Sequence, residues 1–143
     1  MKDVAQFFKV LADEARLKII WLLFNHRELC VCDLMKALDI TQSKTSRHLA
    51  TLRHARLVVD RKEANWAYYS ICPAGNEFER TQLEALRVQM ANHPGAKEVL
   101  GRLHDWMERK QRDPGCVDDC ACPNAKTSKK AAPGRAARKG DLR

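Results

Sequence analysis

The 143-residue sequence lacks long apolar runs, internal repeats and an export signal. Its longest unbroken apolar stretch is the six residues from Ile19 to Phe24, whereas a membrane-spanning helix needs roughly 20. Lys2, Asp3 and Lys9 interrupt the N-terminus before a signal-peptide core can form. Glycine numbers only six, and no cysteine lies in a glycine-rich, phosphate-cradling loop. These absences argue against a membrane protein, a secreted protein and a thiol-dependent reductase, and we expect a cytoplasmic protein.

The positive charge is concentrated at the C-terminal end of the chain. The net charge is +8, and residues 126–143 hold seven basic residues and one acidic residue, a share of +6. Residues 126–143 also have no large apolar side chain before Leu142, and residues 113–143 are predicted to form a disordered basic tail. The tail is either a source of sequence-independent attraction to phosphates or only a solubilising end. The remainder is slightly basic, so local clusters must carry any argument for nucleic-acid binding.

The apolar periodicity predicts mainly helices with one hairpin, an α+β chain of the winged helix-turn-helix class. We expect residues 1–92 to form the DNA-binding and dimerisation domain and residues 93–112 to form a C-terminal helix. Asp13 and Thr41 are good N-caps for two of the helices. The apolar stripes of the first and last helices predict a two-fold dimer contact. The expected helices cover residues 4–11, 14–25, 31–38, 42–55, 78–90 and 96–112, and the two wing strands cover 57–62 and 66–71.

The segment 41–49 has the pattern of a recognition helix. Thr45, Leu49 and Leu52 point toward the core, and small or basic side chains point away from it. Small hydroxyl groups let the backbone approach a DNA groove, while Gln and Arg can reach base edges and Lys can meet phosphates. We favour a structural hydrogen bond for His48 over a base contact, because it flanks the core side. The candidate DNA-binding residues are Gln42, Ser43, Lys44, Ser46, Arg47 and His48, with Arg61 and Lys62 on the wing.

Two of the six cysteines, Cys30 and Cys32, lie immediately before the helix-turn-helix. Residues two apart do not face each other on a helix, but they share a side of an extended strand. An ion held by both thiolates therefore favours unwinding of the first turn of the third helix. Thiolate pairs prefer soft ions. Trivalent arsenic or antimony takes three sulfurs, whereas zinc or cadmium normally takes four ligands.

Three motifs together resemble the ArsR/SmtB family of metal-responsive repressors, and most closely its arsenic-responsive branch. The motifs are Glu28-Leu-Cys-Val-Cys-Asp-Leu34, Ser46-Arg-His-Leu49, and Asp60-Arg-Lys with Trp66 and Tyr69. The resemblance covers roughly residues 3–91. It implies a homodimer that binds a palindromic operator in double-stranded DNA and releases it on binding As(III) or Sb(III), which act as inducers of arsenic-resistance genes.

The chain departs from this family at several positions. Met35 stands where the enterobacterial motif has a third cysteine, which leaves the third ligand open among Cys116, Cys120 and Cys122, with Cys72 a weaker candidate. Glycines that the family places after the recognition helix and at the hairpin tip are replaced by Arg56 and Ala64. If those positions need positive φ, each replacement costs roughly 1 kcal/mol, unless the turns differ or Asn65 takes the left-handed position.

Three other functions compete with metalloid sensing. An enzyme is disfavoured, because no strand–helix alternation predicts a reductase scaffold. A redox-sensing repressor remains an alternative, because closely spaced thiols oxidise. A repressor responsive to Cd, Zn or Pb is the other alternative, although no histidine lies between Tyr69 and Met90, where the helix metal site of the family would need one.

Overall fold

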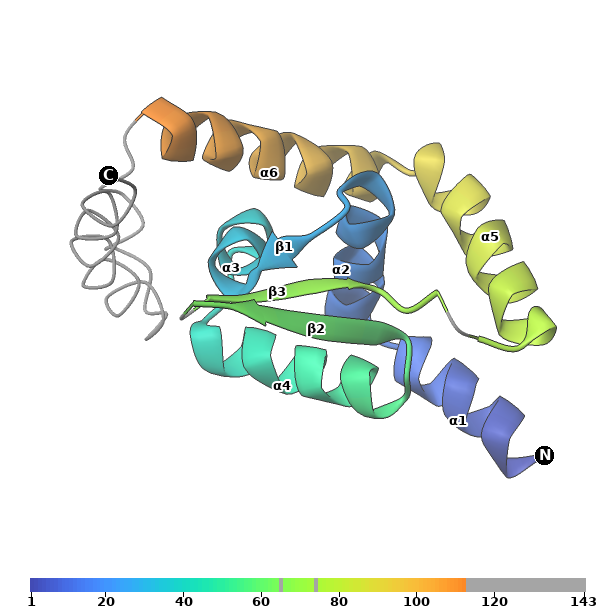
Figure 1. Cartoon of the computed structure of the whole chain (residues 1–143). Coiled ribbons are helices and arrows are strands. Elements are labelled where there is room, and N and C mark those ends of the chain that lie inside the picture. Colours follow the sequence, from blue (N-terminus) through green and yellow to red (C-terminus); the bar gives the residue numbers. More distant parts are fainter. Residues whose placement is uncertain (65, 74, 113–143) are drawn as a thin grey trace, which may run out of the picture.

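The computed structural model describes residues 1–64, 66–73 and 75–112. The predicted tail at 113–143, with its three cysteines, lies outside these residues. The helices are α1 (Lys2–Leu11), α2 (Glu14–Asn25), α3 (Val31–Leu38), α4 (Gln42–His54), α5 (Glu77–Ala91) and α6 (Pro94–Arg112), and the strands are β1 (Leu29–Cys30), β2 (Val58–Glu63) and β3 (Trp66–Ile71). This order is that of a winged helix-turn-helix domain (Figure 1). None of the described helices has the length and apolar character needed to cross a bilayer.

Two of the predicted N-caps start their helices as expected. The Asp13 side chain accepts a hydrogen bond from the Arg16 amide at 3.1 Å. The Thr41 side chain accepts one from the Lys44 amide at 3.2 Å. Each bond satisfies an amide that the first turn of a helix leaves without a partner. Asp39, at φ 56°, ends α3 in the left-handed region and turns the chain toward α4.

The predicted hairpin is confirmed, but the sheet has a third strand. Its order is β1-β3-β2, and all pairs are antiparallel. The two residues of β1 pair with the centre of β3, with Cys30 opposite Tyr68. The strand β1 was not predicted from the sequence, because a two-residue strand is too short to leave an alternating pattern in the sequence. The extra strand fixes Cys30 at the edge of the wing.

The helix α2 lies at the centre of the core. Ile19, Ile20 and Leu22 are fully buried, and α3, α4, α5 and α6 all pack against this helix. In Figure 1, α6 runs along one side of α2 and α3, and α4 lies under the wing. The packing of α3 on both α4 and α6 means that a change in α3 reaches both helices.

The last described helix, α6, differs from the expectation in its start and in its partners. It begins at Pro94 rather than near Ala96, since proline is favoured at the first helical position, where no amide hydrogen is needed. Its apolar stripe is covered by α2 and α3 of the same chain and does not supply the exposed face expected of a dimer contact. The buried stripe consists of Ala96, Val99, Leu103 and Trp106.

The two residues that stand where the family has glycine both adopt a left-handed backbone conformation. Arg56 has φ 62° and Ala64 has φ 56°. The turn after α4 and the tip of the wing therefore keep a backbone that glycine would adopt without strain. Each side chain costs stability of the order of 1 kcal/mol at these positions.

Candidate functional site

The Cys30 and Cys32 side chains lie where an extended strand meets a helix. Cys30 ends β1 with φ −89° and ψ 171° and is the N-cap of α3, while Cys32 is the second residue of that helix. They are 1% and 0% exposed. The pair is therefore divided between two backbone conformations, and the thiols do not share one side as they would on a continuous strand.

Asp33 holds this junction together. Its carboxylate accepts hydrogen bonds from the Cys30 amide at 3.1 Å, the Trp106 indole nitrogen at 2.8 Å and the Lys110 ammonium at 2.9 Å. The side chain of Asp33 is buried, and a buried carboxylate is stable only when it is paired in this way. The first bond caps α3, and the other two attach α6 to the cysteine motif.

Lys110 also brings a positive charge to the thiol of Cys30. The Lys110 ammonium lies 3.9 Å from the Cys30 sulfur. Burial lowers the pKa of Lys110, but the charges of Asp33 and Cys30 outweigh burial and raise that pKa above its ordinary value. Burial raises the pKa of Tyr68, and the nearby charge of Cys30 adds to this effect. The Cys30 sulfur thus lies beside the end of α6 and beside an ammonium group.

The residues described by the structure supply no third ligand to the cysteine pair. Within residues 1–64, 66–73 and 75–112, no three His, Cys, Asp or Glu side chains form a group able to hold a metal. Cys72 lies four positions along the chain from Tyr68, the partner of Cys30, a separation of roughly 13 Å in an extended backbone. Met35 packs against the core. The three tail cysteines, Cys116, Cys120 and Cys122, fall outside the described residues.

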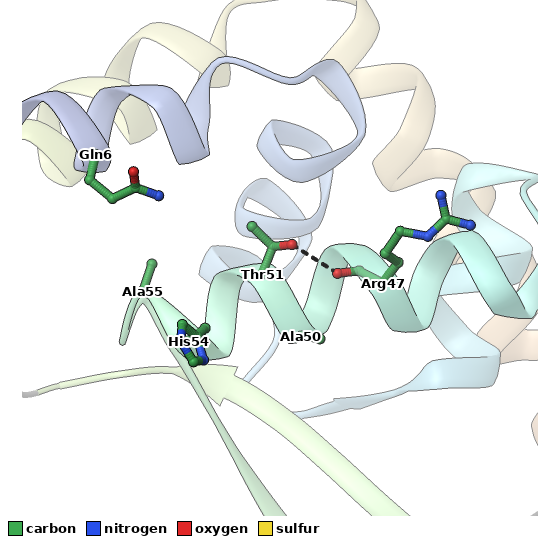
Figure 2. A pocket seen from close by; sticks show the side chains of 6 residues that line it. All are labelled: Gln6, Arg47, Ala50, Thr51, His54 and Ala55. Atoms are coloured by element: carbon green, nitrogen blue, oxygen red, sulfur yellow. Dashed lines mark hydrogen bonds between the residues drawn. The ribbon is translucent and has the colours of Figure 1, made fainter.

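The predicted recognition face is on the surface of α4. Ser43, Lys44, Ser46 and Arg47 are exposed and Gln42 is half-buried, whereas Thr45 on the opposite side is fully buried. Figure 2 shows Arg47 and His54 on α4 around an open hollow that Gln6 of α1 closes on one side. The structure thus presents the predicted polar side chains together on one surface of one helix.

His48 and Arg61 already have protein partners. The Nδ1 atom of His48 lies 3.4 Å from an Arg16 guanidinium nitrogen on α2. Arg61 donates two hydrogen bonds to Glu28, at 2.8 and 2.9 Å, and stacks over Tyr68. The hydrogen bonds from Arg61 hold the pKa of Glu28 below its usual value. Lys62 is exposed on the same strand.

Sequence reasoning missed the roles of Asp33, Trp106 and Lys110. A signal was available, because Lys110 falls on the apolar stripe of α6, and a charged residue in such a stripe indicates a buried partner. The identity of that partner was not accessible, since Asp33 lies 77 positions away.

Comparison with known sequences places this chain among bacterial regulators. Residues 13–59 match the model described as "Bacterial regulatory protein, arsR family". The chain is 56% identical over 68 residues to the "Arsenical resistance operon repressor" of Escherichia coli, covering 48% of this chain and 58% of that protein. It is 38% identical over 110 residues to "Arsenic resistance transcriptional regulator ArsR1" of Pseudomonas putida, covering 77% and 84%. It is 43% identical over 69 residues to "Cadmium resistance transcriptional regulatory protein CadC" of Listeria innocua, covering 48% and 58%.

Solved structures share the fold. Reduced HlyU from Vibrio cholerae superposes with a TM-score of 0.54 at 33% identity, covering 62% of this chain and 88% of that one. The homodimeric winged helix-turn-helix DNA-binding domain of Mb0332 from Mycobacterium bovis superposes with a TM-score of 0.53 at 28% identity, covering 65% and 82%.

Proposed function

The chain belongs to the arsR family of bacterial regulatory proteins, and from that premise we propose that it is a metalloid-responsive transcriptional repressor. It binds operator DNA as a homodimer and dissociates when trivalent arsenic or antimony binds Cys30 and Cys32. The observation that carries the proposal is the position of the two thiols across the start of α3, the helix that packs against the recognition helix α4.

The exposed face of α4 enters the major groove of the operator. Arg47 reaches a base edge, and Lys44 meets a phosphate near the N-terminus of the helix, where the free amides add attraction for anions. Lys62, on the wing, contacts the phosphate backbone of the DNA. Arg61 contributes only after it exchanges Glu28 for phosphate, because the carboxylate already occupies its guanidinium.

The inducer acts by competing with helix formation. Two thiolates on one ion need the backbone of Cys30 to Cys32 to be extended, whereas the DNA-binding form has Cys32 in the first turn of α3. Binding therefore unwinds that turn and displaces α3 relative to α4. A helix that no longer sits squarely in the groove loses its base contacts, and the operator is released.

Single cysteine variants test the proposal. Cys30→Ser and Cys32→Ser should bind operator DNA as the wild type does but remain bound in arsenite, while Cys72→Ser should respond normally. Operator binding is measured by fluorescence anisotropy under reducing conditions. Normal release from both variants would place the inducer site elsewhere. Release by peroxide without arsenite, and none by arsenite, would favour a redox sensor.

The third sulfur comes from the tail cluster of Cys116, Cys120 and Cys122. Lys110, near the end of α6, already touches the Cys30 thiol. Cys116 follows four positions after the end of α6, and four extended residues span about 13 Å, so the tail cysteines enter the chain close to the end of α6 that reaches Cys30. A chain ending at Arg112 should need more arsenite for release, whereas a control chain ending at residue 125 keeps the cysteines and should respond normally. Equal responses would remove the tail from the mechanism.

The dimer forms through α1 and α5. Val4 and Phe8 on α1 and Phe78 and Val88 on α5 are exposed. The Phe8 and Phe78 rings lie 6.0 Å apart, so the two helices present one apolar surface. Phe8→Asp should give a monomer by sedimentation velocity and weaken operator binding, since each half-site would then be bound separately.

Cadmium is the second candidate inducer, favoured by the 43% identity to CadC of Listeria innocua. Cadmium normally takes four ligands, so it would need two ligands beyond Cys30 and Cys32. A titration of the repressor–operator complex with cadmium and with arsenite separates the two. Release by cadmium at lower concentration than by arsenite would make this a cadmium sensor.

A further inference from the structure

Asp33 connects the cysteine motif to a helix that lies far from it in sequence. One carboxylate oxygen accepts the Cys30 amide, which caps α3, and the other accepts both Trp106 and Lys110 from α6. The bond from Trp106 spans 73 positions of the chain and is buried. The turn that the inducer must unwind is therefore held by α6 as well as by its own capping bond.

Trp106 and Lys110 act on the inducer site without lying in the exposed surface of α4. Trp106 is 2% exposed, so its indole has no access to DNA. Lys110 lies over the Trp66 ring of the wing and beside the Cys30 sulfur. Their common partner is Asp33, whose carboxylate they orient toward the Cys30 amide.

We propose that Trp106 and Lys110 set the inducer concentration at which the repressor releases its operator, because their hydrogen bonds hold Asp33 against the first turn of α3. The inference rests on the proposed function and adds α6 to its mechanism. In the DNA-binding form, α6 stabilises the wound turn. An inducer that unwinds the turn must also break the bond between the Cys30 amide and Asp33, and its apparent affinity is reduced by the stability of the braced form.

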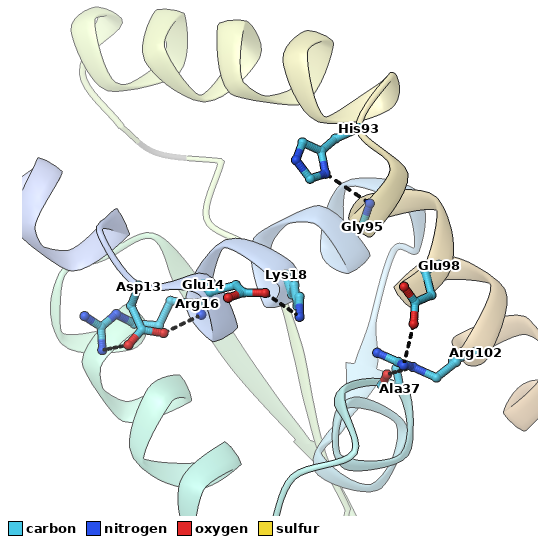
Figure 3. A network of polar contacts seen from close by, with 9 residues as sticks. All are labelled: Asp13, Glu14, Arg16, Lys18, Ala37, His93, Gly95, Glu98 and Arg102. Atoms are coloured by element: carbon cyan, nitrogen blue, oxygen red, sulfur yellow. Dashed lines mark hydrogen bonds and ion pairs between the residues drawn. The ribbon is translucent and has the colours of Figure 1, made fainter.

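The chain offers a matched control on the same helix. Arg102 donates from its Nε atom to the Ala37 carbonyl at 2.8 Å and pairs with Glu98 at 3.1 Å (Figure 3). It thus joins α6 to the C-terminal end of α3, away from Cys30. Removing this bond weakens the packing of α6 on α3 but leaves the bracing of Asp33 intact.

The first test is the arsenite concentration that releases half of the operator from the full-length protein. Trp106→Phe removes the indole hydrogen bond and keeps every charge near Cys30, and Lys110→Met removes the ammonium. Both should release at roughly tenfold lower arsenite, the effect of losing one bond to a buried charge. Arg102→Met should stay within about twofold of the wild type. Shifts no larger than that of Arg102→Met, or shifts to higher arsenite, would overturn the inference.

The second test needs no inducer. Hydrogen exchange of the Cys30 amide, followed by NMR, should be at least about fivefold faster in Trp106→Phe than in Arg102→Met, because the indole hydrogen bond no longer orients Asp33. Unchanged exchange would refute the bracing role even if arsenite releases the operator. If the Cys30 amide exchanges faster but arsenite does not release the operator, the proposed function is refuted instead. In that case α6 only stabilises α3.

Discussion

The buried pair of Asp33 and Lys110 allows a quantitative prediction. The carboxylate oxygen and the ammonium nitrogen are 2.9 Å apart, with side chains 4% and 28% exposed. At an effective dielectric constant near 20, the attraction between unit charges at this distance is about 6 kcal/mol. Desolvation of both groups offsets more than half of it. A net coupling of about 2 kcal/mol remains as the stabilisation that the pair gives the folded chain.

A double-mutant cycle measures this coupling. Asp33→Asn should lower the free energy of unfolding by about 3 kcal/mol, because it leaves the half-buried ammonium without a counter-charge. Lys110→Met should cost about 2–3 kcal/mol, because it leaves the carboxylate buried with fewer partners. The double variant should lose less than the sum of the two losses by about 2 kcal/mol. Urea unfolding at pH 7, followed by circular dichroism, gives all four values.

The dependence on pH provides an independent check. Because the folded state raises the pKa of Lys110 above 10.5, the stabilisation is fully present below that pH and is lost only as the pH rises through the folded pKa. The coupling should therefore be constant between pH 6 and 9. A coupling below about 0.5 kcal/mol, or one that varies across this range, would refute the reasoning.

Three further predictions concern the backbone, the pH response and DNA recognition. Arg56→Gly should raise the free energy of unfolding by about 0.5–1 kcal/mol, because glycine adopts the positive φ of this position without strain. The control Ala55→Gly, at φ −80°, should lower the free energy of unfolding by a similar amount. Equal losses in urea unfolding for the two variants would contradict the strain at Arg56. Burial, together with neighbouring His104, lowers the pKa of His26, so the unfolded chain binds more protons and stability should fall as the pH drops below 6.5. The variant His26→Phe should lose less over that range, and identical profiles would exclude His26 as the cause. Arg47→Ala should weaken operator binding by about 1–3 kcal/mol while leaving binding to random DNA almost unchanged; equal losses on both would make Arg47 a phosphate contact.

Much of the exposed polar surface of α4 could be predicted because the signals are local. The caps at Asp13 and Thr41 and the alternation of buried and exposed residues on α4 depend on neighbours within a few positions. The same holds for Arg56 and Ala64, whose left-handed backbone stands where the resemblance indicated glycine. The predicted DNA-binding side chains on α4 were found on one surface for this reason.

The surroundings of the thiols could not be predicted to the same depth. The sequence placed Cys30 and Cys32 at the start of a helix, but it gave no sign that β1 would pair with β3. The partners of His48 and Arg61 were also unforeseen, since Arg16 and Glu28 lie 32 and 33 positions away. Such contacts leave no periodic trace along the chain.

The sequence by itself determined the class of fold, the exposed polar face of α4 and the close spacing of two thiols, because periodicity, capping and residue type act over one or two turns of chain. Only the tertiary structure decided that α6 would cover its own apolar stripe and bring Trp106 and Lys110 to Asp33. The physical reason is that a buried carboxylate must find donors wherever packing supplies them, and packing between distant helices follows from the whole core.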